Sequence, residues 1–155
     1  MAGPIASVIA REPLSAAQLG SVADFIASKA ARVEGDSFWV SGRPFIWIAG
    51  EEYPGQLSEV DLSEVIGWQP KGQVILIAMC NDKVDHRILA DLCIEVALLL
   101  DGIIDFEGWL GDVTPKIGQI WKSTYESVPG TAFSHLGTPE FLRWWLEQPG
   151  FHMIK

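Results

Sequence analysis

The residues best suited to chemistry are four carboxylates that lie close together past the middle of the chain. Asp101, Asp105, Glu107 and Asp112 form the strongest acidic cluster in the sequence. Paired carboxylates can act as general acid and base, or bind a divalent metal ion. No calcium-loop pattern accompanies them, and no histidine or asparagine lies among them. The simplest interpretation is a solvated loop and strand end; a protein-binding patch comes next, and a metal or catalytic site last.

The other residues that could carry a reaction are poorly spaced for it. His86, His135 and His152 show none of the spacings typical of zinc ligands. Ser134 directly precedes His135, but adjacent residues of a strand point to opposite faces of a sheet, which separates a nucleophile from its base. The sequence contains no G-x-S-x-G elbow, no P-loop and no G-x-G-x-x-G turn. We therefore predict that the protein is not an enzyme, and that it uses no metal ion and no cofactor.

The negative charge of the chain is concentrated in one segment. The 155 residues carry a net charge of −9. From Glu51 to Asp112, thirteen acids stand against three bases, whereas the rest of the chain has seven acids and eight bases. Such a field repels nucleic acid and anionic lipid, and it attracts basic proteins. We expect a basic protein partner, with neither nucleic acid nor membrane; plain solubility is the alternative explanation for the acidity.

Two tryptophans lie next to turns and close to these acids. An aromatic ring rimmed by charge is typical of a binding hot spot, whereas Trp39, Trp47 and Trp145 are expected in the core. The candidate partner-binding residues are Glu51, Glu52, Glu59, Asp61 and Glu64 around Trp68, and Asp101, Asp105, Glu107 and Asp112 around Trp109.

The elements that must position these residues follow from hydrophobic periodicity and capping residues. Strands are predicted at 4–11, 38–40, 45–48, 73–79, 103–106, 131–135 and 151–154, and helices at 15–33, within 57–68, at 82–101 and at 139–148. Leu92, Val96 and Leu99 are predicted to be buried in the long helix. Residues 109–121 fit no element. This order predicts one α+β domain over residues 1–155, with a mixed, mostly antiparallel sheet and about three helices packed on it.

Composition also bears on where the protein works. No apolar run approaches the roughly 18 residues that cross a bilayer. Cys80 and Cys93 both lie in apolar runs and fit buried free thiols, which are typical of a reducing compartment. We therefore expect a cytoplasmic protein.

Two stretches carry a resemblance to a known group of proteins. The first is Asp101-Gly102-Ile103-Ile104-Asp105-Phe106-Glu107-Gly108, and the second is Pro139-Glu140-Phe141-Leu142-Arg143-Trp144-Trp145-Leu146 with the ending Pro149-Gly150-Phe151-His152-Met153-Ile154-Lys155. The C-terminal half is similar to small bacterial proteins that resemble immunity proteins of polymorphic and secreted toxin systems. The resemblance implies an inhibitor of a cognate toxin, with a nuclease as one candidate, and it supplies no site residues. A small-molecule-binding or accessory-subunit domain is the alternative, and a hydrolase using Asp105, Glu107 and His135 is the third hypothesis.

Overall fold

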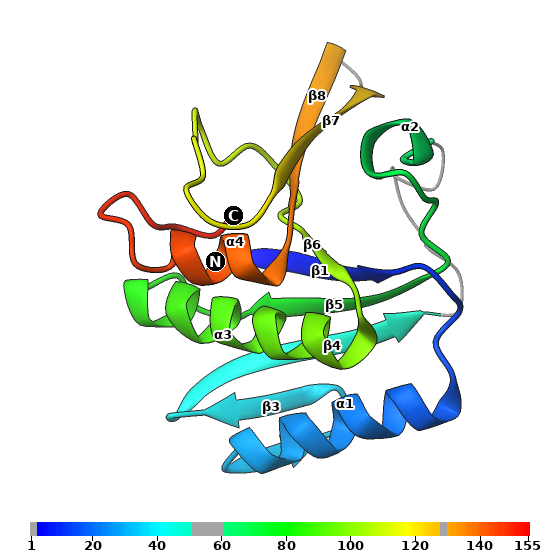
Figure 1. Cartoon of the computed structure of the whole chain (residues 1–155). Helices are drawn as coiled ribbons and strands as arrows, with labels where there is room; N and C mark the ends of the chain where they lie inside the picture. Colours follow the sequence, from blue (N-terminus) through cyan, green and yellow to red (C-terminus); the bar gives the residue numbers. More distant parts are fainter. Residues whose placement is uncertain (1–2, 51–60, 128–129) are drawn as a thin grey trace.

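The computed structural model describes residues 3–50, 61–127 and 130–155, which form one sheet with helices on both sides (Figure 1). The strands are β1 (Ile5–Ala10), β2 (Arg32–Glu34), β3 (Ser37–Val40), β4 (Arg43–Gly50), β5 (Gly72–Ala78), β6 (Ile103–Asp105), β7 (Ile120–Ser127) and β8 (Gly130–Gly137). The helices are α1 (Ala16–Lys29), α2 (Ser63–Ile66), α3 (Lys83–Leu100) and α4 (Pro139–Trp145).

The sheet has the strand order β2-β3-β4-β5-β1-β6-β8-β7, and every neighbouring pair is antiparallel. The most apolar strand, β5, lies between β4 and β1 near the middle of the sheet, as its composition predicts. The predicted α+β class is thereby confirmed.

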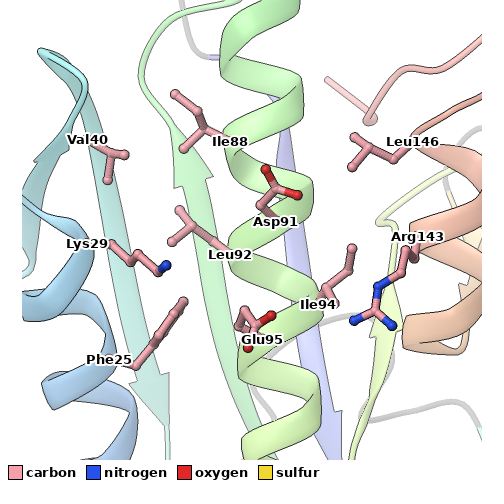
Figure 2. Close-up of a pocket in the computed structure, with 10 residues that line it drawn as sticks. All are labelled: Phe25, Lys29, Val40, Ile88, Asp91, Leu92, Ile94, Glu95, Arg143 and Leu146. Atoms are coloured by element: carbon pink, nitrogen blue, oxygen red, sulfur yellow. The ribbon is translucent and has the colours of Figure 1, made fainter.

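Three helices cover one face of the sheet. Figure 2 shows α1, α3 and α4 side by side in front of the strands. The long helix α3 packs on β1, β5 and β6 and on both neighbouring helices. Its buried side chains include Leu89, Cys93 and Val96, which meet Val8 and Leu76 in the main core.

The opposite face carries a smaller core. Ile9 and Leu136, on two different strands, pack there with Leu62 from the segment that leads into α2. Trp68 and Trp121 lie at the margin of this cluster and are half-buried. The segment 61–70 is therefore a small cover over the sheet.

Local sequence signals set most of the element boundaries. Ser15 begins α1 with a capping box to Gln18, and Asp82 begins α3 with a capping box to Asp85. The turn between β3 and β4 has consecutive positive φ angles at Ser41 and Gly42, as a two-residue hairpin turn requires. These boundaries agree with the sequence predictions.

Three assignments differ from the predictions, two of them because strand pairing overrides local propensity. The first helix ends at Lys29 rather than near Val33, since residues 32–34 pair with β3 as strand β2. Residues 120–127, for which no strand was predicted, form β7 against β8. Residues 151–154 are not a strand, although the Ile154 carbonyl accepts a hydrogen bond from the amide of Ile5 at 2.9 Å.

The last turn of α3 also corrects a prediction. Leu92 and Val96 are buried as predicted, but Leu99 is 44% exposed, because the apolar stripe passes to Leu100 instead. After Leu100 the chain turns back at once, with Asp101 in the left-handed conformation. Gly102 follows, where a Cβ would lie 2.4 Å from the Ile9 carbonyl oxygen. Glycine is needed there because the chain enters β6 in direct contact with β1.

None of the helices in the described ranges combines the length and the apolar composition that a membrane span requires.

Burial of α3 gives a direct test of this packing. Leu92→Ala should lower the free energy of unfolding by about 2–5 kcal/mol, because it removes a buried side chain and leaves a cavity. Leu99→Ala, the same change on the exposed side of α3, should lower the free energy of unfolding by less than about 1 kcal/mol. Urea denaturation of the two variants measures both values, and equal losses would contradict the orientation of α3 described here.

Candidate functional site

A groove lies at the C-terminal end of α3, where four parts of the chain meet. Its volume is about 370 Å³. Ile66 at the end of α2 and Trp68 just after it form one side, the end of α3 and Ile103 form another, and residues at the starts of β7 and α4 complete the groove. The groove thus joins Trp68 from the first predicted acidic group with Asp101 from the second.

The groove is aromatic on one side. Trp68 and Trp121 both line it, and both are held by packing against the small core of the far face. The guanidinium of Arg11 lies over the Trp68 ring, with its Cζ 5.1 Å from the ring centroid. This contact is a cation–π interaction, which shows that the Trp68 face accepts a guanidinium group.

The groove is negative on the other side. Asp101 caps α3 at the end where the backbone carbonyls give a helix its partial negative charge, and the last turn of α3 contains no basic residue. Glu140 lies in the first turn of α4 and offsets the positive end of that helix. Both carboxylates are on exposed residues. Among the described residues that line the groove, Arg11 is the one basic residue.

The remaining acids predicted around Trp68 lie close in sequence to this wall of the groove. Glu64 is exposed in α2, and Asp61 is exposed just before it. The side chain and the amide of Ser63 both donate to Asp61, which lowers the pKa of that carboxyl. Glu51, Glu52 and Glu59 lie outside the described residues.

The second predicted group does not form one surface. Asp105 is fully buried, where it accepts hydrogen bonds from the Ser134 hydroxyl at 2.6 Å and from the amide of Glu107 at 2.9 Å. This places Asp105 inside the fold rather than on the expected protein-binding surface. The physical reason is that β6 is an inner strand of the sheet, between β1 and β8.

Glu107 also serves the fold. The residue is exposed overall, yet its carboxylate accepts a hydrogen bond from the buried Ser7 hydroxyl at 2.5 Å. Burial of that carboxyl raises the pKa of Glu107, and the bond from Ser7 lowers it in part. Glu107 has a positive φ of 57°, so this contact holds an unusual turn of the backbone.

Trp109 lies against the β7–β8 hairpin rather than alone among acids. Its ring stacks on that of His135, with centroids 4.1 Å apart, and the ammonium of Lys122 lies 4.7 Å from its ring centroid. The cation beside Trp109 is therefore supplied by the chain itself. Asp112, in the loop that follows, is exposed, and its charge partly offsets the lowering of the His135 pKa by burial and by Lys122, so Asp112 lies near the Trp109–His135 pair, whereas Asp101 lines the groove.

Within the hydrolase hypothesis, His135 does not converge with Asp105. Asp105 is paired with Leu136 in the sheet, so the two side chains share a face. His135 precedes Leu136 and therefore points to the opposite face, where it stacks on Trp109. The same alternation separates Ser134 from His135, as the sequence predicts.

A second groove bears on the small-molecule hypothesis. It has a volume of about 320 Å³ and crosses α3 between α1 and α4 (Figure 2). Its apolar lining includes Phe25, Ile88 and Leu92. Four charged residues line it: Lys29 from α1, Asp91 and Glu95 from α3, and Arg143 from α4 (Figure 2). Each cation can be balanced by a carboxylate of α3, so the groove has no excess charge of one sign to select a charged small ligand.

Three residues of the first groove were not singled out from the sequence. Arg11 follows the first strand, Trp121 lies in β7, and Glu140 opens the last helix. They are separated from Trp68 and Asp101 by long stretches of chain. Strand order brings them together, and no local motif marks them.

Comparisons with known proteins give a family without an activity. The sequence model of a family described as a "family of unknown function (DUF6368)" matches residues 2–155. Neither the curated proteins nor the solved structures contain a match to the chain. The resemblance to immunity proteins therefore stays a prediction.

The Trp109 contact predicts a dependence of stability on pH. His135 Nδ1 accepts a hydrogen bond from the amide of Leu110 at 3.0 Å, which only the neutral ring can do. Burial, followed by the charge of Lys122, lowers the pKa of His135. The folded state thus favours the neutral form, and its stability should fall as the pH drops below the unfolded value of about 6.5 towards the lower folded pKa.

His135→Asn tests this origin, because an asparagine oxygen can replace Nδ1 as acceptor without titrating. We expect the unfolding free energy of the variant to change less than that of the wild type between pH 7.5 and pH 5.5. His86 titrates in both proteins, so its effect cancels in the comparison. Identical pH profiles in urea denaturation would exclude His135 as the source.

Proposed function

We propose that this chain, which belongs to the DUF6368 family of unknown function, is a non-catalytic inhibitor that binds a basic protein. One observation carries the proposal: the groove at the end of α3 combines two half-buried indoles with the exposed acids Asp101 and Glu140. Aromatic rings and carboxylates together are the groups that bind an arginine or lysine side chain. The acidic surface around Asp61 and Glu64 extends the attraction to a larger basic face.

The exposed acids and the half-buried tryptophans should affect different steps of binding. Exposed acids at the rim of an interface act mainly on the rate of association, because their field steers the partner over a distance set by the salt concentration. A half-buried tryptophan acts on dissociation, because it is desolvated only in the complex. Arg11 occupies the face of Trp68 in the free protein, so a partner cation would have to displace it or bind beside it.

The identity of the partner rests on the resemblance described above. An immunity protein neutralises a toxin made by the same cell, and its binding surface needs no catalytic group. A toxin that cleaves nucleic acid carries a basic surface for the phosphate backbone, and an acidic groove can cover such a surface by mimicking phosphate. We therefore propose a cytoplasmic protein that blocks a basic bacterial toxin, with a nuclease as the leading candidate.

Removing the charges of the groove should slow binding to this partner. We expect the double change Asp101→Asn and Glu140→Gln to reduce the association rate with the product of the adjacent gene by roughly tenfold at low salt, and by less at physiological salt. Asparagine tolerates the left-handed backbone of residue 101, so the fold should be kept. Stopped-flow mixing or surface plasmon resonance measures the rate.

The control is Asp24→Asn, which removes an exposed acid of α1 that does not line the groove. It should leave the association rate nearly unchanged at both salt concentrations. If the groove variant behaves like the control while the complex still forms, the groove is not the contact surface. If no complex forms with the adjacent product, and co-expression gives no protection from it, the inhibitor proposal itself is wrong.

A further inference from the structure

A third cavity, lined by basic rather than acidic residues, lies at the N-terminal end of α3. Its volume is about 320 Å³, and its lining residues are Asn81, Lys83, His86 and Arg87 at the start of α3 and Gln148, Pro149, Phe151 and His152 near the C-terminus. Arg87 of this cavity and Ala97 of the acidic groove are the nearest lining residues on α3, and at a rise of about 1.5 Å per residue they lie roughly 15 Å apart along the helix axis. A basic cavity is unexpected in a chain with a net charge of −9.

The two cationic side chains of this cavity form few and long contacts with other described residues. Lys83 is exposed and forms no ion pair within the described part of the chain. Arg87 donates to the Leu146 carbonyl at 3.2 Å, and its contact with the exposed Glu147 is long, at 3.4 Å. Both side chains can therefore turn towards a ligand with little loss.

His86 fixes the orientation of the Asn81 side-chain amide, whose NH₂ group is a neutral donor. The amide of Met153 donates to His86 Nδ1 at 2.9 Å, so the proton of the neutral ring lies on Nε2 and is donated to the Asn81 side-chain oxygen at 3.0 Å. Asn81 thereby has its oxygen engaged and its NH₂ group available. Burial lowers the pKa of His86, and the nearby positive charges of His152 and Lys155 contribute to the shift.

His152 lies on the C-terminal side of the cavity. Its Nδ1 is 2.9 Å from the Gly150 carbonyl oxygen, which can only accept, so the Nδ1 proton is held by that carbonyl. Phe151, half-buried and packed on Trp145, supplies an apolar wall beside these polar groups.

We infer that this cavity binds a phosphate group, carried as a phosphomonoester on a small flat organic molecule. The Lys83 ammonium, the Arg87 guanidinium and the Asn81 NH₂ group line one space together with the C-terminal segment, and between them they offer enough donors for the three terminal oxygens of a phosphomonoester. A carboxylate offers two coplanar oxygens and would use fewer of them. The wall formed by Phe151 is suited to a flat organic group.

The test uses phenyl phosphate as the probe, with inorganic phosphate, benzoate and phenol for comparison. In 150 mM sodium chloride we expect phenyl phosphate to bind with a dissociation constant of about 1 mM or lower, with NMR shift changes at the Asn81 side-chain amide and the Arg87 guanidinium. Inorganic phosphate and benzoate should each bind about tenfold more weakly, and phenol should not bind measurably.

Two matched variants locate the site. Lys83→Gln should weaken phenyl phosphate about tenfold, the usual effect of losing one charged hydrogen bond. Lys116→Gln, which removes the same charge from an exposed loop residue outside this cavity, should have no effect. Both positions are exposed, so the melting temperature should be unchanged and serves as the check on folding.

Three results would overturn the inference: no saturable binding of phenyl phosphate in 150 mM salt, an equal loss in the two lysine variants, or benzoate binding as tightly as phenyl phosphate. The inference does not depend on the inhibitor proposal, since the probes need no protein partner and the residues lie at the opposite end of α3.

Discussion

Burial of α3 across the sheet is the constraint on which the rest of the structure depends. The helix fills the main core against β1, β5 and β6, and it carries α1 and α4 on its two sides. Its start is fixed by Asp85, which is fully buried, bonds to the amide of Asp82 at 2.7 Å and pairs with Arg43 of the β3–β4 hairpin. The Arg43 guanidinium accordingly lowers the pKa of Asp85. Both ends of α3 lie at the surface. The acidic groove is at its C-terminal end, and the basic cavity is at its N-terminal end.

The two ends of α3 differ in how their charges relate to the helix dipole. Acids favour the first turn of a helix and bases the last. The start of α3 follows this rule with Asp82 and Asp85, although both are paired with Arg43, and Lys83 and Arg87 line the basic cavity. The end of α3 breaks the rule, because Asp101 adds an acid and no base lies in the last turn. Local rules of this kind are broken most often where function requires it. This is a reason, independent of cavity volume, to look for a ligand at the C-terminal end of α3.

The sequence predicts the elements of this fold better than it predicts the sites. Capping residues act within one turn of a helix, so Ser15, Asp82 and Thr138 mark real helix starts. Strand β7 escapes prediction because its sequence alternates weakly, and its pairing with β8 decides its conformation. The acids of residues 101–112 appear to be one cluster only in sequence. Asp105 is buried on the inner strand β6, Asp101 lines the groove at the end of α3, and Asp112 is exposed in the loop after Trp109. Strand order, which local patterns do not encode, decides which of these acids share a surface.

The register of β8 determines what the polar residues near Trp109 can do. In the observed register Leu136 packs with Ile9 on the far face, Ser134 bonds to Asp105 on that same face, and His135 lies under Trp109 on the other. Bringing His135 to Asp105 would require β8 to slip by one residue, because side chains alternate along a strand. That slip would remove Leu136 from the small core, take the Ser134 hydroxyl from the buried Asp105, and leave Trp109 without its stacking partner. Each loss exposes an apolar group or takes a hydrogen bond from a buried carboxylate, and both changes lower the stability of the fold. The packing that stabilises the hairpin therefore keeps His135 from joining Asp105 in a single reactive site.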